Sequence, residues 1–264
     1  MDAIRVERRD GLVTLTLDRP AKKNAVDAAM WGELDRAFTA IAANPDDRAL
    51  VLTGAGGNFS AGADLSGNSS GRGLTGASTV QPIVQEMRAM GDIVLKLQRM
   101  PKPTLAKVDG VCVGVSLGLA LACDLVLASD RARFSEIFAK RGLALDGGNS
   151  WLLPRRIGLH KAKELTFFAD IIDAKQAESI GLVNKIVPAG ELDAAADDWG
   201  RRLAAGPTLA LGLSKRLLDA SSAVTFAQAL EDEARCQHIT HASKDVREGI
   251  AAFMERREPR FSGS

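Results

Sequence analysis

The stretch TLAKVDGVCVGVSLGLALACDLVLA, residues 104–128, decides the fold class. Its two ends, 104–108 and 125–128, are short apolar runs rich in branched side chains, and each has the length of one buried strand. The glycines between them recur at every fourth residue: Gly110, Gly114 and Gly118. This spacing is typical of a buried helix whose small face packs closely on a neighbour. A strand, a helix and a further strand in this order indicate an α/β unit with a right-handed crossover.

The same pattern extends on both sides of this unit. Alternating apolar and polar residues around Asp10-Gly11 predict a hairpin. The expected elements before the unit are strands over 4–8, 12–17 and 49–53 and helices over 27–43 and 82–99. After the unit the pattern turns helical, with only 183–187 extended. We therefore expect an α/β core over residues 1–190 and a helical region over 191–264, within one functional unit, that serves oligomerisation or forms a lid.

The composition excludes several classes of protein. With 34 basic and 33 acidic residues the net charge is +1, which argues against a dedicated nucleic-acid binder. The longest uncharged run covers only 110–123, whereas a membrane-spanning helix needs about 20 residues. Residues 1–9 lack the apolar stretch of a signal peptide, and the three cysteines have no paired spacing. We expect a cytoplasmic protein with no nucleic-acid and no membrane partner.

Metal and serine-nucleophile chemistry find little support in the sequence. His238 and His241 lie three residues apart near Cys236, so a metal site is conceivable, but the neighbouring acids favour a solvated helix face. His160 is interpreted as structural. No base can be named beside Ser116, so no Ser–His–Asp set is expected. We expect no metal.

Six blocks of the chain resemble, in order, those of the crotonase (enoyl-CoA hydratase/isomerase) superfamily. They are RPAKKNA at 19–25, LTG at 52–54 with AGADL at 61–65, KPT at 102–104 through DG at 109–110 to CD at 123–124, LPR at 153–155, AKQAESIGLV at 174–183 and EGIAAFMERR at 248–257. Each block alone is weak, but the ordered set spans nearly the whole chain. The resemblance implies a ββα spiral core with a helical C-terminal trimerisation region, assembled as trimers or paired trimers. It also implies an acyl-CoA thioester as substrate, with coenzyme A as part of that substrate and no other cofactor.

The resemblance further assigns an oxyanion hole, in which two backbone N–H groups hold the thioester carbonyl. By the two motifs those donors are Ala63 and Val115. A helix that starts near Gly114 also presents free N–H groups at its first turn, and small residues before Leu65 let a ligand lie against main chain. Family members usually carry glycine where Val115 stands, so its side chain narrows the space beside the thioester. The implied substrate and CoA contacts are Lys22, Ala25, Ala61, Asp64, Leu65, Phe138, Phe253 and Arg257.

The carboxylates that this family uses for hydration are missing. Hydration there needs two glutamates around one water, and the matching residues in this chain are Gly118 and Phe138. Glu136 lies two positions before Phe138. An extended segment would point both side chains to one face, whereas a helix would direct Glu136 elsewhere, so we expect Glu136 to be a poor substitute.

Asp146 is the acid that remains where the family often places catalysis. Asp-Gly is also a turn signal and acids before helices act as caps, so without the resemblance a turn is the favoured interpretation. The block around it, residues 142–155 (GLALDGGNSWLLPR), resembles the one-aspartate subgroup, which contains enoyl-CoA isomerases and the phenylacetate-pathway epoxide isomerase. It departs from that subgroup at Leu145, where a proline is common. Apolar neighbours should raise the pKa of the Asp146 carboxyl.

The expected activity is a shift of a double bond from Δ3 to Δ2, or the isomerisation of a ring-derived acyl-CoA, with Asp146 as the single proton carrier. Two alternatives stay open: an enoyl-CoA hydratase that uses Glu136, and a non-catalytic acyl-CoA-binding protein. The loop 66–78 and the residues near Trp151 are expected to shape the acyl pocket.

Overall fold

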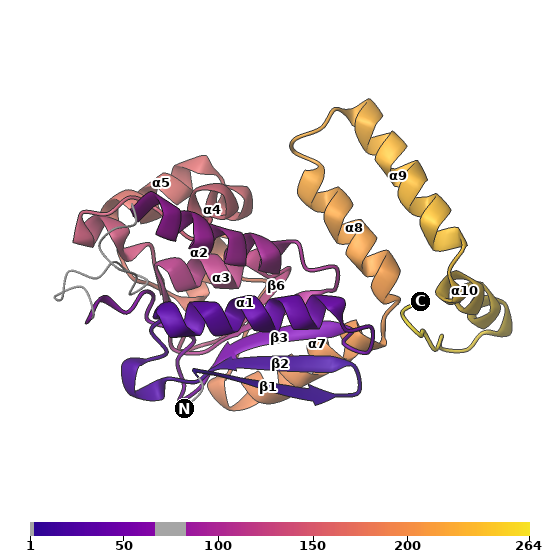
Figure 1. Ribbon diagram of the computed structural model, residues 1–264, viewed down its shortest axis with the longest axis horizontal. Coiled ribbons are helices and arrows are strands. Elements are labelled where there is room, and N and C mark those ends of the chain that lie inside the picture. Colours follow the sequence, from indigo (N-terminus) through magenta and orange to yellow (C-terminus); the bar gives the residue numbers. More distant parts are fainter. Residues whose placement is uncertain (1–2, 67–82) are drawn as a thin grey trace.

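One six-stranded sheet organises the N-terminal part of the chain. The computed structural model describes residues 3–66 and 83–264. The strand order is β1-β2-β3-β4-β6-β9; β1 and β2 form an antiparallel hairpin, and all other neighbours are parallel (Figure 1). The strands are β1 (Ile4–Arg9), β2 (Leu12–Leu17), β3 (Ala49–Gly54), β4 (Thr104–Val108), β6 (Leu125–Ser129) and β9 (Lys185–Val187). The predicted hairpin and α/β core are therefore confirmed.

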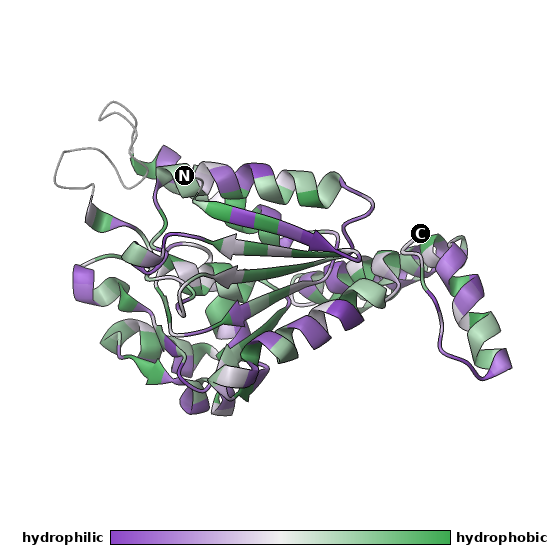
Figure 2. Cartoon of the chain, turned by 90° about the horizontal axis from the view of Figure 1, so that it is seen from below, coloured by the Kyte–Doolittle hydropathy of each residue, from purple (hydrophilic) through white to green (hydrophobic). Residues whose placement is uncertain are grey.

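Helices cover both faces of this sheet. Leu15 and Leu50 belong to the larger core cluster, whereas Leu12 and Val51, which alternate with them along the strands, belong to a second cluster. Burial on both faces explains why the parallel strands are continuous apolar runs. The larger cluster includes residues of α1 (Ala28–Ala43), α2 (Ile83–Gln98) and α3 (Val115–Ala122), and the second includes residues of α7 (Leu192–Ala205). Figure 2 shows the largely apolar central strands with helices to either side.

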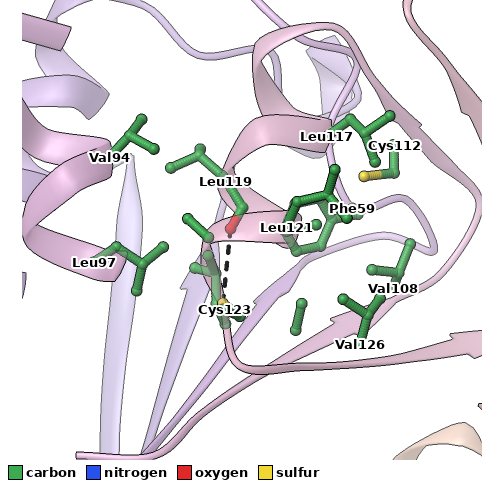
Figure 3. Packing of buried hydrophobic residues seen from close by; sticks show 14 of the residues in the cluster. Phe59, Val94, Leu97, Val108, Cys112, Leu117, Leu119, Leu121, Cys123 and Val126 are labelled. Atoms are coloured by element: carbon green, nitrogen blue, oxygen red, sulfur yellow. Dashed lines mark hydrogen bonds between the residues drawn. The ribbon is translucent and has the colours of Figure 1, made fainter. Parts of the chain in front are cut away.

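The predicted glycine-containing helix is α3, and all of its residues are buried. Figure 3 shows Leu119 directed toward Val94 and Leu97 of α2, and Leu121 beside Phe59. This helix needs no polar face because the surrounding helices and strands exclude water from it on every side. Packing on all sides therefore holds the N-terminus of α3 in a fixed position.

A second, three-stranded sheet fixes the start of α3 and the loops around it. Its order is β5-β7-β8, with β5 parallel to β7 and β7 antiparallel to β8. The strands are β5 (Val111–Val113), β7 (Arg133–Ser135) and β8 (Ile172–Asp173). The chain passes from β5 directly into α3 through Gly114, whose φ of +59° favours glycine. After β7 it forms the 3-10 helix η3 (Ile137–Arg141), so the extended alternative for residues 136–138 is wrong.

The remaining helices complete the core and form a projecting arm. The shorter elements are η1 (Pro20–Lys22), α4 (Asn149–Ile157), α5 (Leu159–Phe168), α6 (Ala174–Ser179) and η4 (Ala189–Glu191), and the arm consists of α8 (Thr208–Ala220), α9 (Phe226–His241) and α10 (Lys244–Glu255). Figure 1 shows α9 and α10 standing away from the sheet. Phe226 and Phe253 on them are 80% and 81% exposed. The expected division at residue 190 stays a prediction, while α7, just beyond it, packs on the sheet.

Within residues 3–66 and 83–264, the structure contains no helix with the length and apolar character that a membrane crossing requires. The loop expected at 66–78 falls outside the described residues except for Ser66.

Candidate active site

Two main-chain segments meet at the N-terminus of α3. Ser60 pairs with Cys112 of β5 in an isolated parallel bridge, and the Ser116 hydroxyl donates to the Ser60 carbonyl at 2.9 Å. A Cβ placed on Gly62 would lie 2.9 Å from the Val113 carbonyl oxygen. Only glycine permits this approach, so the segment that carries Ala63 lies directly against the turn into α3.

The N–H groups of Ala63 and Val115 are candidates for binding an anion. Val26 donates to the Gly62 carbonyl at 2.8 Å and accepts from the Asp64 N–H at 2.9 Å, which leaves the N–H of Ala63 between these two bonds. Val115 is the first residue of α3 and has no preceding turn to accept its N–H. Neither group donates to an acceptor in the described part of the chain. Two such donors can stabilise a negative oxygen.

The loop that carries Asp146 rests on Val115. A Cβ on Gly147 would lie 2.7 Å from the Val115 Cγ2, and Gly147 has a φ of +59°. The Asp146 carbonyl accepts from the Asn149 N–H at 3.1 Å, so a turn is present as the sequence suggested. However, the N-cap of α4 is Gly148, and no side chain caps that helix.

The Asp146 side chain is the candidate base. Its Oδ1 is buried and has no hydrogen-bond partner among the described residues. Burial raises the pKa of this carboxyl to about 6 because water no longer stabilises its charge. Asp146 is therefore neither a helix cap nor a solvated surface acid.

Glu136 lies in the same buried region, contrary to expectation. Its side chain is 0% exposed, and both carboxyl oxygens lack a partner in the described residues. Burial first, and then the charge of Asp146, raise the pKa of Glu136 to about 8. The expectation that a helical turn would direct Glu136 away from the site is wrong, because Glu136 precedes the turn: the Ser135 carbonyl accepts from the Gly114 N–H at 3.0 Å, and η3 starts only at Ile137.

The two positions that match the hydratase glutamates are 118 and 138. The main chain of Gly147 fills the space beside Gly118, and an aromatic ring occupies position 138. A Cβ on Gly118 would lie 2.3 Å from the Gly147 carbonyl oxygen, so position 118 has no room for any side chain. Phe138 is buried in η3. A carboxylate at either position would need a rearranged backbone or core.

Arg19 holds together the segments from which CoA contacts were expected. Its guanidinium pairs with Asp64 at 2.9 Å and with Asp27 at 3.1 Å. The Ser66 hydroxyl first, and Arg19 further, hold the pKa of Asp64 at about 2. The Ala61 N–H donates to the Lys23 carbonyl at 2.9 Å. This region brings together the expected contacts Lys22, Ala25, Ala61, Asp64 and Leu65, of which Lys22 and Leu65 are exposed.

The two expected contacts from the C-terminal helix are not at this site. Phe253 lies on α10 and Arg257 just beyond it, and Figure 1 shows α10 far from α3 and α4. Arg257 pairs with Glu248 at 2.6 Å. A contact of either residue with a ligand at Ala63 would need a second copy of the chain, so their role stays a prediction.

A cavity of about 950 Å³ opens beside the Asp146 loop, between α2, the start of α4 and α8. Trp151 lines it with Gly148 and Leu152, and the Arg155 guanidinium lies 3.8 Å from the centre of the Trp151 ring. A cavity is therefore present where residues near Trp151 were expected to shape an acyl pocket. That this cavity holds the acyl group stays a prediction.

The histidines do not form a cluster. His238 and His241 are exposed on α9, whereas Cys236 is buried, so the three do not share a face. His160 is exposed on α5. Residues 3–66 and 83–264 contain no group of three or more His, Cys, Asp or Glu side chains placed to hold a metal.

Proteins of known family resemble this chain in sequence and in fold. Residues 7–264 match the family model described as Enoyl-CoA hydratase/isomerase. A probable enoyl-CoA hydratase of Rhodobacter capsulatus is 36% identical over 98% of this chain and 98% of its own. The 1,2-epoxyphenylacetyl-CoA isomerase of Escherichia coli is 35% identical over 96% of this chain and 95% of its own. A putative enoyl-CoA hydratase of Streptomyces coelicolor superposes with a TM-score of 0.91 at 34% identity, covering 99% of this chain and 94% of that one.

Proposed function

Because the chain belongs to the enoyl-CoA hydratase/isomerase family of the crotonase superfamily and has its fold, we propose that it is an enoyl-CoA isomerase. It moves a double bond from Δ3 to Δ2 of an acyl-CoA thioester, or isomerises a ring-derived acyl-CoA. The observation that carries this proposal is the buried Asp146 oxygen near the N–H groups of Ala63 and Val115, all three without a hydrogen-bond partner among the described residues. The similarity to an epoxyphenylacetyl-CoA isomerase supports the same subgroup.

The proposed reaction is a 1,3 proton shift. The thioester carbonyl accepts hydrogen bonds from the N–H groups of Ala63 and Val115, which makes the α-proton acidic. Asp146 takes that proton, and the negative charge spreads over the dienolate that forms. The protonated Asp146 then returns the proton to the γ-carbon, which places the double bond in conjugation with the carbonyl. Each N–H donor contributes about 2.7–4 kcal/mol to the stability of the enolate, by analogy with other acyl sites.

The pKa of Asp146 suits this task. A base with a pKa of about 6 is ionised at neutral pH and still holds a proton well enough to return it. The burial of the Asp146 Oδ1 limits the access of water, which would otherwise exchange the proton before it reached the γ-carbon. Coenzyme A enters as part of the substrate, and no other cofactor takes part.

Hydration of a 2-enoyl-CoA is the second candidate, because Glu136 gives the site another buried carboxyl. Relatives named as hydratases are as similar to the chain as the isomerase is. Against it, the Gly147 main chain fills the space at Gly118 where the family places its first glutamate. We further propose that the enzyme is a cytoplasmic homo-oligomer, a trimer or a pair of trimers, in which Phe253 and Arg257 reach the CoA of a neighbouring copy.

The decisive experiment compares trans-3-enoyl-CoA conversion by the wild type, Asp146→Ala and Asp146→Asn. Both variants should lose nearly all turnover, while Asp170→Asn, an exposed control, should retain it. Undiminished turnover in Asp146→Ala would refute the proposal. Water addition to crotonyl-CoA that depends on Glu136 would establish the hydratase instead. Binding of CoA esters without exchange of the α-proton in deuterated water would indicate a non-catalytic binding protein.

A further inference from the structure

Most of the unpartnered buried polar atoms in the described residues lie in one region. Four of the five belong to three residues: Oε1 and Oε2 of Glu136, Oδ1 of Asp146 and Oδ1 of Asn149. All four accept hydrogen bonds, and none can donate one while the carboxyls are ionised. Buried acceptors without a donor are costly. The arrangement therefore lacks at least one proton donor.

Hydrogen bonds of Gly114 and Asn149 place these three residues around the start of α3. The Gly114 N–H donates to the Ser135 carbonyl at 3.0 Å, which fixes the residue before Glu136. The Asn149 side-chain amide donates to the Gly114 carbonyl at 3.1 Å. The Asn149 N–H donates to the Asp146 carbonyl at 3.1 Å. Both acidic segments are thus attached next to Val115, and the two carboxyls are close enough for the charge of one to act on the other.

No cation compensates these two acids in the described residues, since neither forms an ion pair there. On neighbouring elements Arg155 stacks on Trp151, Arg156 donates to the Leu121 carbonyl, and Lys161 pairs with Glu164. The Cys112 thiol of β5 donates to the Ser116 carbonyl at 3.7 Å and stays neutral, because burial first, and then the charge of Glu136, raise its pKa well above the ordinary value. The other charged or titratable residues on the elements nearest to Glu136 are Arg133 on β7, Lys140 and Arg141 on η3, His160 and Lys163 on α5 and Asp173 on β8.

We propose that Glu136 is the neutral partner of Asp146: at neutral pH the two carboxyls hold one proton between them, and Glu136 carries it. Two ionised carboxylates cannot both be accommodated in a buried region without a cation. Glu136 is wholly buried whereas Asp146 is partly exposed, so Glu136 retains the proton. The inference rests on the proposed isomerase function only for its consequences in catalysis.

The order of titration agrees with this assignment. Asp146 ionises first, with a pKa of about 6 that burial alone sets. Glu136 ionises afterwards, with a pKa of about 8 that the charge of Asp146 helps to raise. Between these values the pair offers one base and one O–H donor.

Glu136 is in this view a positioning residue. Its O–H supplies the missing donor and keeps Asp146 ionised in a fixed orientation. When Glu136 ionises, a second negative charge opposes formation of the enolate, so catalysis should decline. The pH dependence of kcat/KM should therefore be bell-shaped, with an acidic limb near pH 6 from Asp146 and an alkaline limb near pH 8 from Glu136.

The test compares the pH profiles of the wild type, Glu136→Gln, Glu136→Leu and the control Glu86→Gln, which alters another buried glutamate. Glu136→Gln keeps a neutral donor, so it should retain kcat/KM at neutral pH within about tenfold and lose the alkaline limb. Glu136→Leu has no donor and should lose activity more severely. Glu86→Gln should keep both limbs. An alkaline limb that persists in Glu136→Gln, or a loss of turnover there as large as in Asp146→Asn, overturns the proposal.

A second measurement needs no substrate and separates this inference from the proposed function. The infrared C=O stretch of a protonated carboxylic acid should be present in the unliganded wild type at neutral pH and absent from Glu136→Gln. If the wild type shows no isomerase activity but has this band, the proposed function fails and the proton assignment holds. If the band does not depend on Glu136, the assignment is wrong whatever the activity.

Discussion

Gly147 lies directly against Val115, with 2.7 Å between an added Cβ and the Val115 Cγ2. The residue after the candidate base thus contacts a residue whose N–H is a proposed enolate donor. We therefore expect this contact to couple the position of Asp146 to the proposed oxyanion hole. It also gives a role to the valine that stands where the family usually has glycine.

The first prediction concerns this contact. Gly147→Ala should lower turnover and destabilise the protein by about 1–3 kcal/mol, because the new methyl group strikes Val115 and the backbone has a φ of +59°. The double variant Gly147→Ala/Val115→Ala should recover part of the turnover, since the clashing methyl is removed. Urea denaturation and 3-enoyl-CoA conversion measure both effects. Equal activity of the single and double variants would show that the contact does not position the base.

A second prediction addresses the missing hydratase glutamate. Gly118→Glu should not create hydratase activity, because the Cβ would lie 2.3 Å from the Gly147 carbonyl oxygen. The variant should be strongly destabilised, and Gly118→Ala should already show a large loss of stability. Crotonyl-CoA hydration and thermal unfolding provide the measurement. A stable Gly118→Glu enzyme that hydrates crotonyl-CoA would contradict the proposed occlusion of this position.

The third prediction follows from the raised pKa of Glu136. A buried carboxyl with a pKa of about 8 instead of 4.5 binds its proton more tightly in the folded state. The free energy of unfolding should therefore fall as the pH rises from about 4.5 to about 8. In Glu136→Gln this pH dependence of the free energy of unfolding should be absent. The variant should therefore be more stable than the wild type near pH 9, by a few kcal/mol at most.

Urea titrations of both proteins at acidic and alkaline pH test this expectation. The stability difference between them should be small near pH 4 and grow toward pH 9. Glu86→Gln again serves as the control for a buried glutamate. A difference that is independent of pH would mean that Glu136 titrates normally.

A fourth prediction concerns the Arg19–Asp64 pair, at 2.9 Å. Asp64→Asn should weaken the attachment of the segment 61–65 to the segment 19–25 and cost about 1–3 kcal/mol of stability. Because Ala63 lies in that segment, kcat should fall as well as the affinity for CoA esters. Asp27→Asn removes the other partner of Arg19 and should affect kcat less. Unchanged kinetics in Asp64→Asn would show that Ala63 is held by its main-chain bonds alone.

The depressed pKa of Asp64 adds a pH dependence to this pair. Its pKa is about 2 in the folded protein and 3.8 otherwise, so the stability it contributes is present above about pH 4. That contribution is lost as the pH falls toward 2. Acid denaturation should accordingly begin at a higher pH in Asp64→Asn.

The elements predicted correctly from the sequence are long enough for their buried side chains to repeat at a regular spacing. The strands at 12–17 and 104–108 and the helix at 28–43 repeat their apolar spacing often enough to be identified. β5 and β8 have three and two residues, too few for any period to show. Those short strands nevertheless fix Gly114 and hence the start of α3.

The site itself could be predicted only in part. Asp146, Ala63 and Val115 lie in blocks that resemble a known family, so their sequence positions could be transferred. The direction of the Glu136 side chain could not be predicted, because Glu136 lies between β7 and η3. If either element were longer or shorter by two residues, the side chain would point to another side. A glutamate usually indicates an exposed position, so the burial of Glu136 is evident only from the structure.

The bonds around Gly114 have a consequence for how this scaffold can be changed. They use main-chain groups of Gly114, Ser135, Asp146 and Asn149 and the side-chain amide of Asn149, but no carboxyl oxygen of Glu136 or Asp146. This set of hydrogen bonds, the frame around Gly114, therefore does not depend on the carboxyl groups of the two acids. An engineer can exchange either acid for another functional group and retain the architecture, whereas a change at Asn149 would disturb every reaction that the frame supports.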